Sequence, residues 1–309
     1  MKNKLTIQIA EGLGNQMFMY AFAYSLSKKF DYELYIDKQS GFSQKKNLLR
    51  SHQKFMLDNF HIEGKYATEK MIYDTNFKRF KKKIKLLLDN FSQKKNFLIE
   101  ENKLFNKKKI AHDLNIIDKS NFSNNLYIQG NFENYNYFIN NKNELQRIFT
   151  VKDEFLNKDN FLIDKIKNSN SISLHIRRNR FSDQKQLKTA ANIKKSYVFT
   201  EDIINYINNS LEFINAKVSN PEYFIWTNDH NDINLLINKL KLKNYTLIKN
   251  NILNDFNLFK YCKHFIVGPS SFHWWGAWLN ENPNKMCIRP KKINPSNNLK
   301  FWPNDWISV

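Results

Sequence analysis

The chain has 309 residues, of which 41% are hydrophobic and 15% aromatic, and it carries a formal net charge of +20. At about 150 residues per domain, this length predicts two domains with folded cores. No run of 18 apolar residues occurs, which argues against a membrane-spanning helix, whereas the positive charge admits nucleic acid, an anionic membrane surface or an anionic substrate as partner.

The N-terminal segment alternates strand, loop and helix patterns. We expect a strand over 5–9, a tight Glu-Gly-Leu-Gly-Asn-Gln loop, a helix over 17–30 and a second strand over 33–37. The first apolar stretch is too short for a signal peptide, so we interpret it as a strand.

One helix is predicted between residues 40 and 125, where other signals are weak. Over 77–91 the lysines occupy one side of the helix and the other side is apolar, formed by Phe77, Phe80, Ile84, Leu87 and Leu88. This pattern fits a helix on a membrane surface, and equally an ordinary solvated basic helix.

The second half of the chain alternates more regularly, after a strand over 126–130 and a helical segment that runs toward residue 157. We expect strands over 171–176, 222–227, 245–250, 264–268 and 285–290, and helices over 196–214, 232–240, 254–262 and 271–280. Such alternation predicts a parallel sheet with right-handed crossovers. Polar residues cluster over 155–168, so we place the domains at 1–158 and 159–309.

Two of the seven glycines, Gly12 and Gly14, lie in the first strand-to-helix loop. The loop is no dinucleotide fingerprint, because the third glycine of that motif would fall on Met17, and no Gly-Lys-Ser/Thr follows it. It fits either an anion site at a helix N-terminus or a tight turn with Asn15 as cap.

The segment SISLHIRRNR (171–180) ends an apolar strand in a histidine and two adjacent arginines. Ligands of open parallel sheets bind outside the carboxyl ends of strands, and arginine forms bidentate bonds with phosphate. Adjacent residues of an extended chain point to opposite faces, so one of Arg177 and Arg178 reaches a ligand while the other braces the loop. Alternatively, neither arginine binds a ligand: one of them forms a salt bridge within the protein and the other is exposed to solvent.

Two further strand exits carry polar residues. After 264–268, Ser270 and Ser271 occupy the N-cap region of a helix with three tryptophans, which either line a site or fill a core. After 222–227, Asn228 and Asp229 either contact a nucleoside or cap a helix.

Metal ligands and disulfides are not indicated by the sequence. The chain has no Asp-x-Asp motif and no paired His or Cys residues at metal-ligand spacing, so we expect no metal or other cofactor. Arginines, amides and hydroxyls would then neutralise a leaving phosphate. The two cysteines, Cys262 and Cys287, have apolar neighbours, which predicts buried free thiols and a reducing cytoplasm.

Five segments resemble motifs of the α-1,2-fucosyltransferase family, glycosyltransferase family 11, and they follow one another along the chain in the same order as in the family. GLGNQMFMYAFA resembles its Gly-x-Gly-Asn-Gln-Met-Phe motif, and LHIRRNR its His-x-Arg-Arg-x-Asp donor motif. YIQGNFENYNYF resembles its Gly-Tyr-Trp-Gln segment, with Asn131 and Phe132 in place of Tyr-Trp. FIWTNDH resembles its Ser-Asp-Asp segment, and CKHFIVGPSSFHWWGAWLN its Ser-Ser-Phe-Ser-Trp-Trp motif.

The resemblance implies an α/β, GT-B-like fold of two facing Rossmann-like domains with parallel sheets. Domain 1–158 would be the acceptor-side lobe and domain 159–309 the lobe that binds the nucleotide sugar. The implied reaction is an inverting, metal-independent transfer of L-fucose from GDP-β-L-fucose to a glycan, forming an α-1,2 linkage to O2 of a terminal galactose. The implied cellular location is the cytoplasm, or alternatively the inner face of the membrane, where the protein would be peripherally bound.

The resemblance also implies roles for individual residues. Arg177 and Arg178 would be catalytic. No general base is evident: Glu11, Asp183 and Glu133 are the candidates, and a base is dispensable if departure of the leaving group leads the reaction. Donor-binding residues would be Gly12, Gly14, Asn15, Gln16, His175, Asn228, Asp229, Ser270, Ser271, Phe272 and Trp274. The acceptor would contact Asn131, Phe132 and Glu133.

Two departures from the family pattern leave alternatives open. Arg180 replaces the acidic residue of the donor motif, and Asn228 replaces the first Asp of Ser-Asp-Asp. Arg180 adds a phosphate contact, or Asp183 takes the acidic role, or the donor differs. The alternatives are a related transferase for another nucleotide sugar, an inactive GDP-binding scaffold, or a basic nucleic-acid-binding protein, for which no motif is found.

Overall fold

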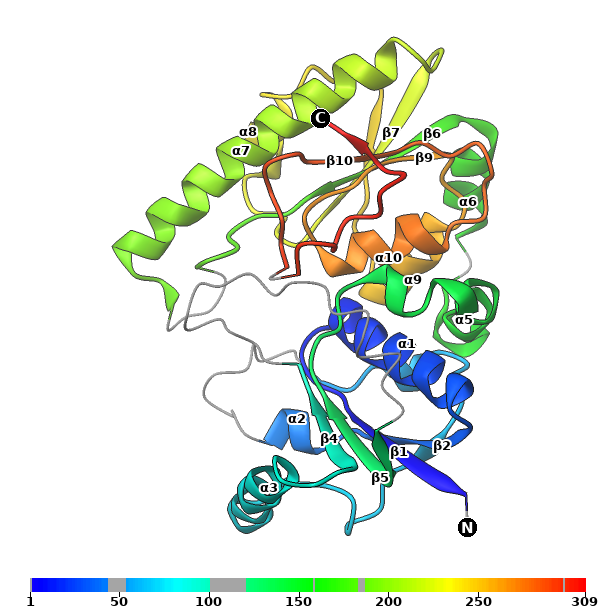
Figure 1. Ribbon diagram of the computed structural model, residues 1–309. Coiled ribbons are helices and arrows are strands. Elements are labelled where there is room, and N and C mark those ends of the chain that lie inside the picture. Colours follow the sequence, from blue (N-terminus) through cyan, green and yellow to red (C-terminus); the bar gives the residue numbers. More distant parts are fainter. Residues whose placement is uncertain (1, 44–53, 101–120, 158, 183–186, 297) are drawn as a thin grey trace. The chain divides into compact units, whose positions relative to one another are not determined.

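The computed structural model describes residues 2–43, 54–100, 121–157, 159–182, 187–296 and 298–309 (Figure 1). The chain divides into two compact α/β units. Unit 1 comprises Met1–Thr150 and Ser296–Pro303, and unit 2 comprises Val151–Pro295 and Asn304–Val309. Asp183 lies outside the described residues.

Unit 1 contains a parallel sheet in the order β3-β2-β1-β5-β4. The strands are β1 (Asn3–Gln8), β2 (Tyr32–Asp37), β3 (Lys65–Tyr66), β4 (Lys95–Ile99) and β5 (Phe122–Gln129). Helix α1 (Leu13–Lys29) is buried over nearly all of its length, because it is apolar on every side. The remaining helices are α2 (Ser40–Ser43), α3 (Asn76–Asp89) and α5 (Lys142–Ile148), with 3₁₀ turns η1 (Leu57–Asn59), η3 (Tyr135–Tyr137) and η4 (Ile139–Asn141).

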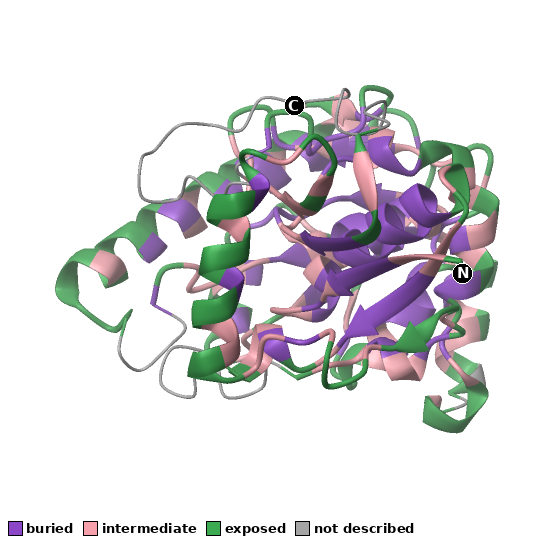
Figure 2. Ribbon diagram, turned by 60° about the horizontal axis from the view of Figure 1, so that its bottom comes forward, coloured by how far each residue is buried: buried purple, intermediate pink, exposed green. Residues whose placement is uncertain are grey.

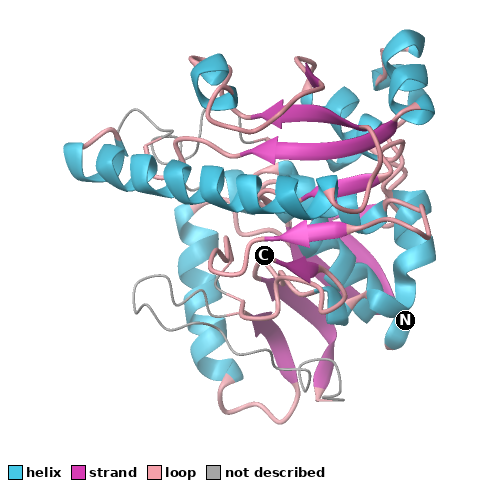
Figure 3. Cartoon of the chain, turned by 90° about the horizontal axis from the view of Figure 1, so that it is seen from above, coloured by secondary structure: helices cyan, strands magenta, loops and turns pink. Residues whose placement is uncertain are grey.

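Unit 2 contains a second parallel sheet in the order β11-β10-β9-β6-β7-β8. Its strands are β6 (Asn170–Ile176), β7 (Pro221–Thr227), β8 (Tyr245–Leu247), β9 (His264–Ile266), β10 (Cys287–Arg289) and β11 (Ile307–Ser308). Its helices are α6 (Asn160–Asn168), α7 (Ala190–Asn215), α8 (Ile233–Ile237), α9 (Ile252–Phe259) and α10 (Ser271–Leu279), preceded by turn η5 (Asp153–Phe155). The long helix α7 runs alongside the strands of this sheet, roughly in line with them (Figure 3).

The core of unit 2 has two sides, one on each face of its sheet. On one face, Ile172 and Leu174 of β6 belong to the apolar cluster that includes Ile203 and Ile207 of α7. On the other face, Trp226 of β7 packs against the Phe259 ring of α9 with 5.0 Å between centroids. The strands are accordingly mostly buried, whereas the outer sides of many helices are exposed (Figure 2).

The expected alternation of strands and helices and the parallel sheets are confirmed, with differences at element ends. Helix α1 begins at Leu13 and includes part of the expected loop, and α7 begins at Ala190 because the Thr189 side chain accepts a bond from the Asn192 N–H. The strand over 95–99 was not expected. The helical segment toward residue 157 consists of α5 and short 3₁₀ turns.

Each sheet has a point at which its strand order reverses. In unit 2 the chain proceeds from β6 through β7 to β8 on one side, and from β9 through β10 to β11 on the other. In unit 1 the corresponding neighbours are β1 and β5. Open parallel sheets bind ligands at the carboxyl ends of such strands, so both reversal points are candidate ligand-binding sites. No helix in the described part of the chain is long and apolar enough to cross a membrane.

Candidate functional site

The reversal point of unit 2 brings together two of the predicted site segments. Strands β6 and β9 are hydrogen-bonded neighbours, with Leu174 opposite Ile266. The end of β6 and the residues that follow it, His175–Arg180, therefore meet the loop that joins β9 to α10. Gly268 makes this approach possible, because a Cβ there would overlap the backbone oxygen of His175 and lie 2.6 Å from its Nδ1 atom.

Two buried histidines lie beneath this loop, with their ring centroids 5.3 Å apart. His273 is fully buried, and its Nδ1 atom accepts the Gly268 N–H at 3.2 Å. Its proton is therefore on Nε2, which donates to the Ser173 hydroxyl at 2.7 Å. Burial lowers the pKa of both rings, and with the Arg177 charge it lowers the pKa of His175 to about 3. Both rings are neutral near pH 7, so positive charge here comes from arginine.

The buried histidines make unfolding pH-dependent. The pKa of His175 in the folded protein, about 3, lies below the ordinary histidine value of 6.5. The unfolded chain therefore binds more protons as the pH falls below about 6.5, and the free energy of unfolding decreases by at most about 1.4 kcal/mol per pH unit for each such ring. We expect His175→Asn to reduce this decrease when urea unfolding is compared at pH 7.5 and pH 5. His61→Asn, at an exposed ring, should behave as the wild type. An unchanged pH dependence in His175→Asn would contradict the assignment.

Arg178 braces the loop after β7. Its Nη1 atom donates to the backbone oxygens of Asp229 (3.2 Å) and Asn231. Its guanidinium also lies 3.8 Å from the Asp229 carboxylate, and the side chain is only 13% exposed. Asp229 further accepts bonds from the Asn179 side chain and the Asn231 N–H. These contacts give Arg178 and Asp229 positions inside the protein framework, in agreement with the bracing role that the sequence allowed for one arginine.

Asn228 forms a two-bond pair with the backbone of Arg178. Its Oδ1 atom accepts the Arg178 N–H at 2.7 Å, and its Nδ2 atom donates to the Arg178 oxygen at 3.2 Å. An aspartate could make only the first bond, because an ionised carboxylate has no proton to donate. Asn228, in place of the first Asp of the Ser-Asp-Asp pattern, is thus explained by the second hydrogen bond that only an amide can donate.

We expect Asn228→Asp to destabilise the protein, although it restores the pattern. It removes one hydrogen bond and places a carboxylate against the Arg178 oxygen, which costs about 1 kcal/mol at this exposed position. Thermal unfolding should show a lower midpoint than in the wild type. A higher midpoint would contradict the pairing.

Arg180 connects the β9–α10 loop to the segment before β11. Its Nη2 atom donates to the Pro295 oxygen at 2.6 Å, and its Nη1 atom lies 3.4 Å from the Pro269 oxygen. Its guanidinium carbon lies 5.7 Å from the centroid of the Phe199 ring. The arginine that replaces the acidic residue of the motif therefore holds the loop that carries Ser270.

Helix α10 begins at this loop without a side-chain cap. Ser270 is its N-cap residue, and its hydroxyl makes no capping bond within the described chain. Ser271 and Phe272 open the helix and are partly exposed. The N–H groups of a first helical turn and two serine hydroxyls are thus placed beside the exit of β6, an arrangement that suits an anion.

Two predicted contacts are corrected by burial. Trp274 is fully buried, and its ring stacks on Trp278 with 5.6 Å between centroids, so the predicted donor contact is replaced by a core role. Phe132 is also fully buried, and its ring stacks on that of Phe22 with 3.9 Å between centroids, so it is not an acceptor contact in this structure. Phe272 packs partly on Phe259, with 5.4 Å between centroids.

The reversal point of unit 1 carries the Gly-x-Gly loop. Glu11 has a positive φ of 64°, and its carboxylate accepts a bond from the Asn15 side chain. Gln16 is fully buried and donates to the Glu11 and Lys54 oxygens, while its Oε1 atom accepts the Met56 N–H. Every polar atom of Gln16 is therefore used to fix the loop. A Cβ on Gly12 would meet nothing within 4 Å, so Gly12 borders open space.

The segment after β5 is held by a glutamate that sequence reasoning missed. Glu100, directly after β4, accepts the N–H groups of Asn131 (2.9 Å) and Phe132 (2.6 Å). Its burial raises the pKa of the carboxyl group, and these two bonds oppose the rise. Glu133 accepts a hydrogen bond from the Ser296 hydroxyl. Asn131 and Glu133 thus lie just beyond the carboxyl end of β5, and their contact with an acceptor stays a prediction.

The described residues contain no group of three or more His, Cys, Asp or Glu side chains that could hold a metal ion. Cys262 and Cys287 are both free and buried, as predicted.

A comparison with known families decides the identity of the chain. Residues 4–307 match the model described as Glycosyl transferase family 11. The chain belongs to glycosyl transferase family 11. The resemblance of its five motifs to this family is thereby confirmed, and the protein is a glycosyltransferase.

Two relatives of this family 11 chain come from Escherichia coli. Alpha-1,2-colitosyltransferase is 25% identical over 98% of this chain and 97% of its own. The O-antigen biosynthesis glycosyltransferase WbnK is 24% identical over 97% of this chain and 99% of its own. Among solved structures, NodZ alpha-1,6-fucosyltransferase soaked with GDP-fucose matches with a TM-score of 0.52 at 11% identity, over 91% of this chain and 93% of its own. This likeness confirms the predicted GT-B fold.

Sequence reasoning located most strand exits of this family 11 chain but missed residues that support them. His273 takes the place of the third serine in the Ser-Ser-Phe-Ser-Trp-Trp motif but was not singled out, and Glu100 lies in a region with weak periodicity. A glutamate at the end of a short apolar run, FLIE, was the available signal for Glu100.

Proposed function

We propose that the chain transfers L-fucose, with inversion, from GDP-β-L-fucose to a glycan hydroxyl, O2 of a terminal galactose, in polysaccharide biosynthesis. The observation that supports this most is the reversal point of unit 2. There, the arginine that follows β6 and the N-terminus of α10 lie at the ends of neighbouring strands. Such a place, with guanidinium and free N–H groups, suits the diphosphate of a nucleotide sugar.

In this proposal Arg177 is the residue that meets the diphosphate. Arg178 and Arg180 donate to backbone oxygens of neighbouring loops and so position the strand exit. His175 is neutral and buried, and it supports the Gly268 loop without adding charge. The hydroxyls of Ser270 and Ser271 contribute further donors.

The reaction breaks the bond between the anomeric carbon and the diphosphate oxygen, and forms a bond to the acceptor oxygen. Negative charge grows on the departing phosphate, where Arg177 and the first turn of α10 stabilise it. The acceptor proton passes to a base, for which Glu11 and Glu133 remain candidates, together with Asp183 outside the described residues. Separate Glu11→Gln and Glu133→Gln variants would identify it by loss of turnover with retained GDP binding.

A different donor sugar is the second candidate. It rests on the relative named alpha-1,2-colitosyltransferase, which indicates that the donor varies among proteins this similar. The test is a panel of nucleotide sugars incubated with the chain and terminal-galactose acceptors in the presence of EDTA. Turnover of GDP-fucose alone supports the first proposal, and preference for GDP-colitose supports the second.

Two other outcomes of this test would overturn both proposals. GDP binding without turnover of any sugar would indicate an inactive scaffold. Salt-sensitive binding of nucleic acid, with no affinity for GDP, would indicate a nucleic-acid-binding protein. Turnover that requires added metal would contradict the metal-independent mechanism.

A further inference from the structure

Helix α3 presents its apolar face to solvent. Phe77, Phe80, Leu87 and Leu88 are between 61% and 65% exposed, and Phe91, just after the helix, is 91% exposed. With Ile84, which is 44% exposed, the five positions on α3 fall within an arc of about 100° around the helix axis, and Phe91 follows directly after the helix. We call these six residues the α3 stripe. Single exposed apolar residues are common, whereas a continuous stripe of this kind marks an interaction surface.

The polar side of α3 packs against unit 1, the reverse of the usual arrangement. Lys82 is only 8% exposed, and its Nζ atom donates to the Gln129 side chain at 2.5 Å. Its burial lowers the pKa of the ammonium group to about 8. Near the end of the helix, Asp89 accepts the N–H groups of Asn96 (2.8 Å) and Phe97 (3.1 Å).

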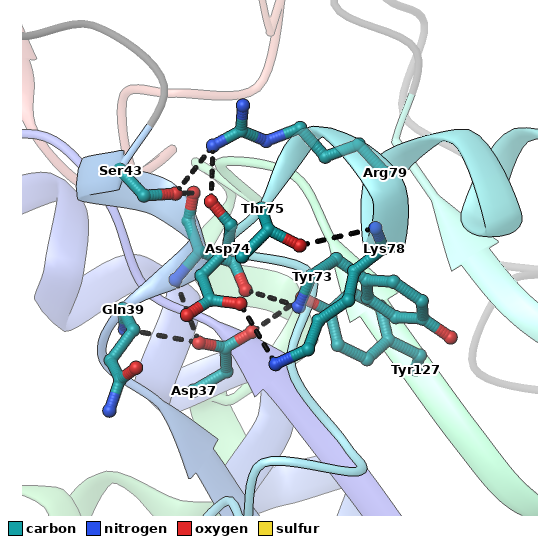
Figure 4. A network of polar contacts seen from close by, with 10 residues as sticks. Asp37, Gln39, Ser43, Tyr73, Asp74, Thr75, Lys78, Arg79 and Tyr127 are labelled. Atoms are coloured by element: carbon teal, nitrogen blue, oxygen red, sulfur yellow. Dashed lines mark hydrogen bonds and ion pairs between the residues drawn. The ribbon is translucent and has the colours of Figure 1, made fainter.

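The first turn of α3 is fixed by further polar contacts (Figure 4). Lys78 pairs with Asp74 at 3.0 Å, and the Arg79 Nη2 atom donates to the Ser43 hydroxyl at 2.8 Å and to the Asp74 backbone oxygen at 2.6 Å. Asp37, at the end of β2, accepts the backbone N–H of Ser40 at 2.9 Å. The helix is therefore held at both ends without its apolar side chains, and these remain available for a partner.

The charges beside the α3 stripe indicate the chemistry of that partner. Exposed Lys81 and Lys85 follow one edge of the stripe and exposed Lys83 follows the other. The Lys81 Nζ atom lies 4.3 Å from the centroid of the Phe77 ring, so its stem already covers part of the stripe. Lysines can extend from an apolar surface toward the phosphate groups of lipids while aromatic and aliphatic side chains enter the acyl boundary.

We propose that α3 and Phe91 dock the chain onto the surface of a bilayer that contains anionic lipids. The stripe would enter the interface, and the lysines at its edges would contact lipid phosphates. Apolar side chains in the middle of a basic surface favour a bilayer over nucleic acid, which would need no such stripe. This inference goes beyond the proposed transfer reaction and does not rest on the donor site.

The experiment is flotation of the full chain with vesicles of phosphatidylcholine, with or without phosphatidylglycerol. We expect binding to the anionic vesicles, weaker binding at high salt, and little binding to phosphatidylcholine alone. Phe80→Ser/Leu87→Ser should lower the partition coefficient by about tenfold or more. Phe161→Ser is the matched control, because Phe161 is 82% exposed on α6 of unit 2, and it should bind as the wild type.

A second set of variants tests the charges. Lys81→Gln/Lys83→Gln/Lys85→Gln should lose most of the preference for anionic vesicles, whereas Lys217→Gln/Lys249→Gln/Lys260→Gln, at exposed lysines of unit 2, should retain it. Unchanged circular dichroism and thermal midpoints would show that the variants fold. The proposal is overturned if the wild type fails to bind anionic vesicles, or if the stripe variant binds them equally well. A wild-type dimer that Phe80→Ser/Leu87→Ser dissociates, without vesicle binding, would instead assign the stripe to a second copy of the chain.

Discussion

In the Arg177→Ala variant we expect the turnover number to fall on the order of a hundredfold or more. A preorganised donor aimed at charge that grows in the transition state is typically worth about 3–4 kcal/mol. The neighbouring arginines cannot take over this role without leaving their present contacts, because Arg178 holds the loop after β7 and Arg180 holds the Pro269 and Pro295 oxygens. His175 cannot supply the charge either, since its pKa of about 3 leaves the ring neutral.

The measurement is steady-state kinetics with GDP-fucose and a galactoside acceptor, with the thermal midpoint as a control for folding. Arg177→Lys keeps the positive charge but loses the planar guanidinium group that can form two bonds with a phosphate. Its turnover number should therefore lie between those of the wild type and the alanine variant. Arg147→Ala, at an exposed arginine of α5 in unit 1, should have the turnover of the wild type. Undiminished turnover in Arg177→Ala would remove this residue from the mechanism.

The Gly268→Ala variant should lose both stability and affinity for GDP. The added Cβ would overlap the His175 backbone oxygen, and that atom can move only if the exits of β6 and β9 separate. Such overpacking typically costs about 1–3 kcal/mol, or about 2–4 °C in the thermal midpoint for each kcal/mol. Displacing the loop that carries Ser270 should weaken GDP binding by about tenfold, the loss of one good hydrogen bond to a charged group.

Two glycines provide the controls for this variant. A Cβ on Gly276 would lie 2.6 Å from Cγ of the Phe259 ring, so Gly276→Ala should also lower the thermal midpoint while the folded protein keeps its GDP affinity. A Cβ on Gly12 meets nothing within 4 Å, so Gly12→Ala should cost less than about 1 kcal/mol. Calorimetric titration with GDP, at a temperature well below the thermal midpoints, distinguishes a variant that loses GDP affinity from one that loses only stability. Wild-type stability and affinity in Gly268→Ala would contradict the close approach of the two strand exits.

The sequence predicted the strands of unit 2 well because buried parallel strands are short, continuous apolar runs. SISLHI and EYFIWT are such runs, and both lie in the sheet. Strand β4 was not predicted because its segment lacks clear turn-forming residues at its ends. Helix α3 was predicted, but periodicity shows only that two faces differ and not which one packs. In α3 the packed face is the polar one, through Lys82 and Asp89.

The candidate site was predicted in part for a similar reason. Motifs at strand exits place Arg177, Arg178 and Ser270 near one sheet edge, since carboxyl ends of parallel strands lie together. They cannot tell which arginine braces a loop, because the partners of Arg178 are backbone oxygens of another segment. Aromatic residues of a motif can likewise be core residues, as the burial of Trp274 and Phe132 shows.

A crystal structure of the chain with GDP, grown in the presence of EDTA, tests the central claim most directly. We predict that phosphate oxygens lie within about 3 Å of the Arg177 guanidinium and of the first backbone N–H groups of α10, beside Gly268. Phosphates bound elsewhere on the chain, with Arg177 directed away from them, would contradict the account.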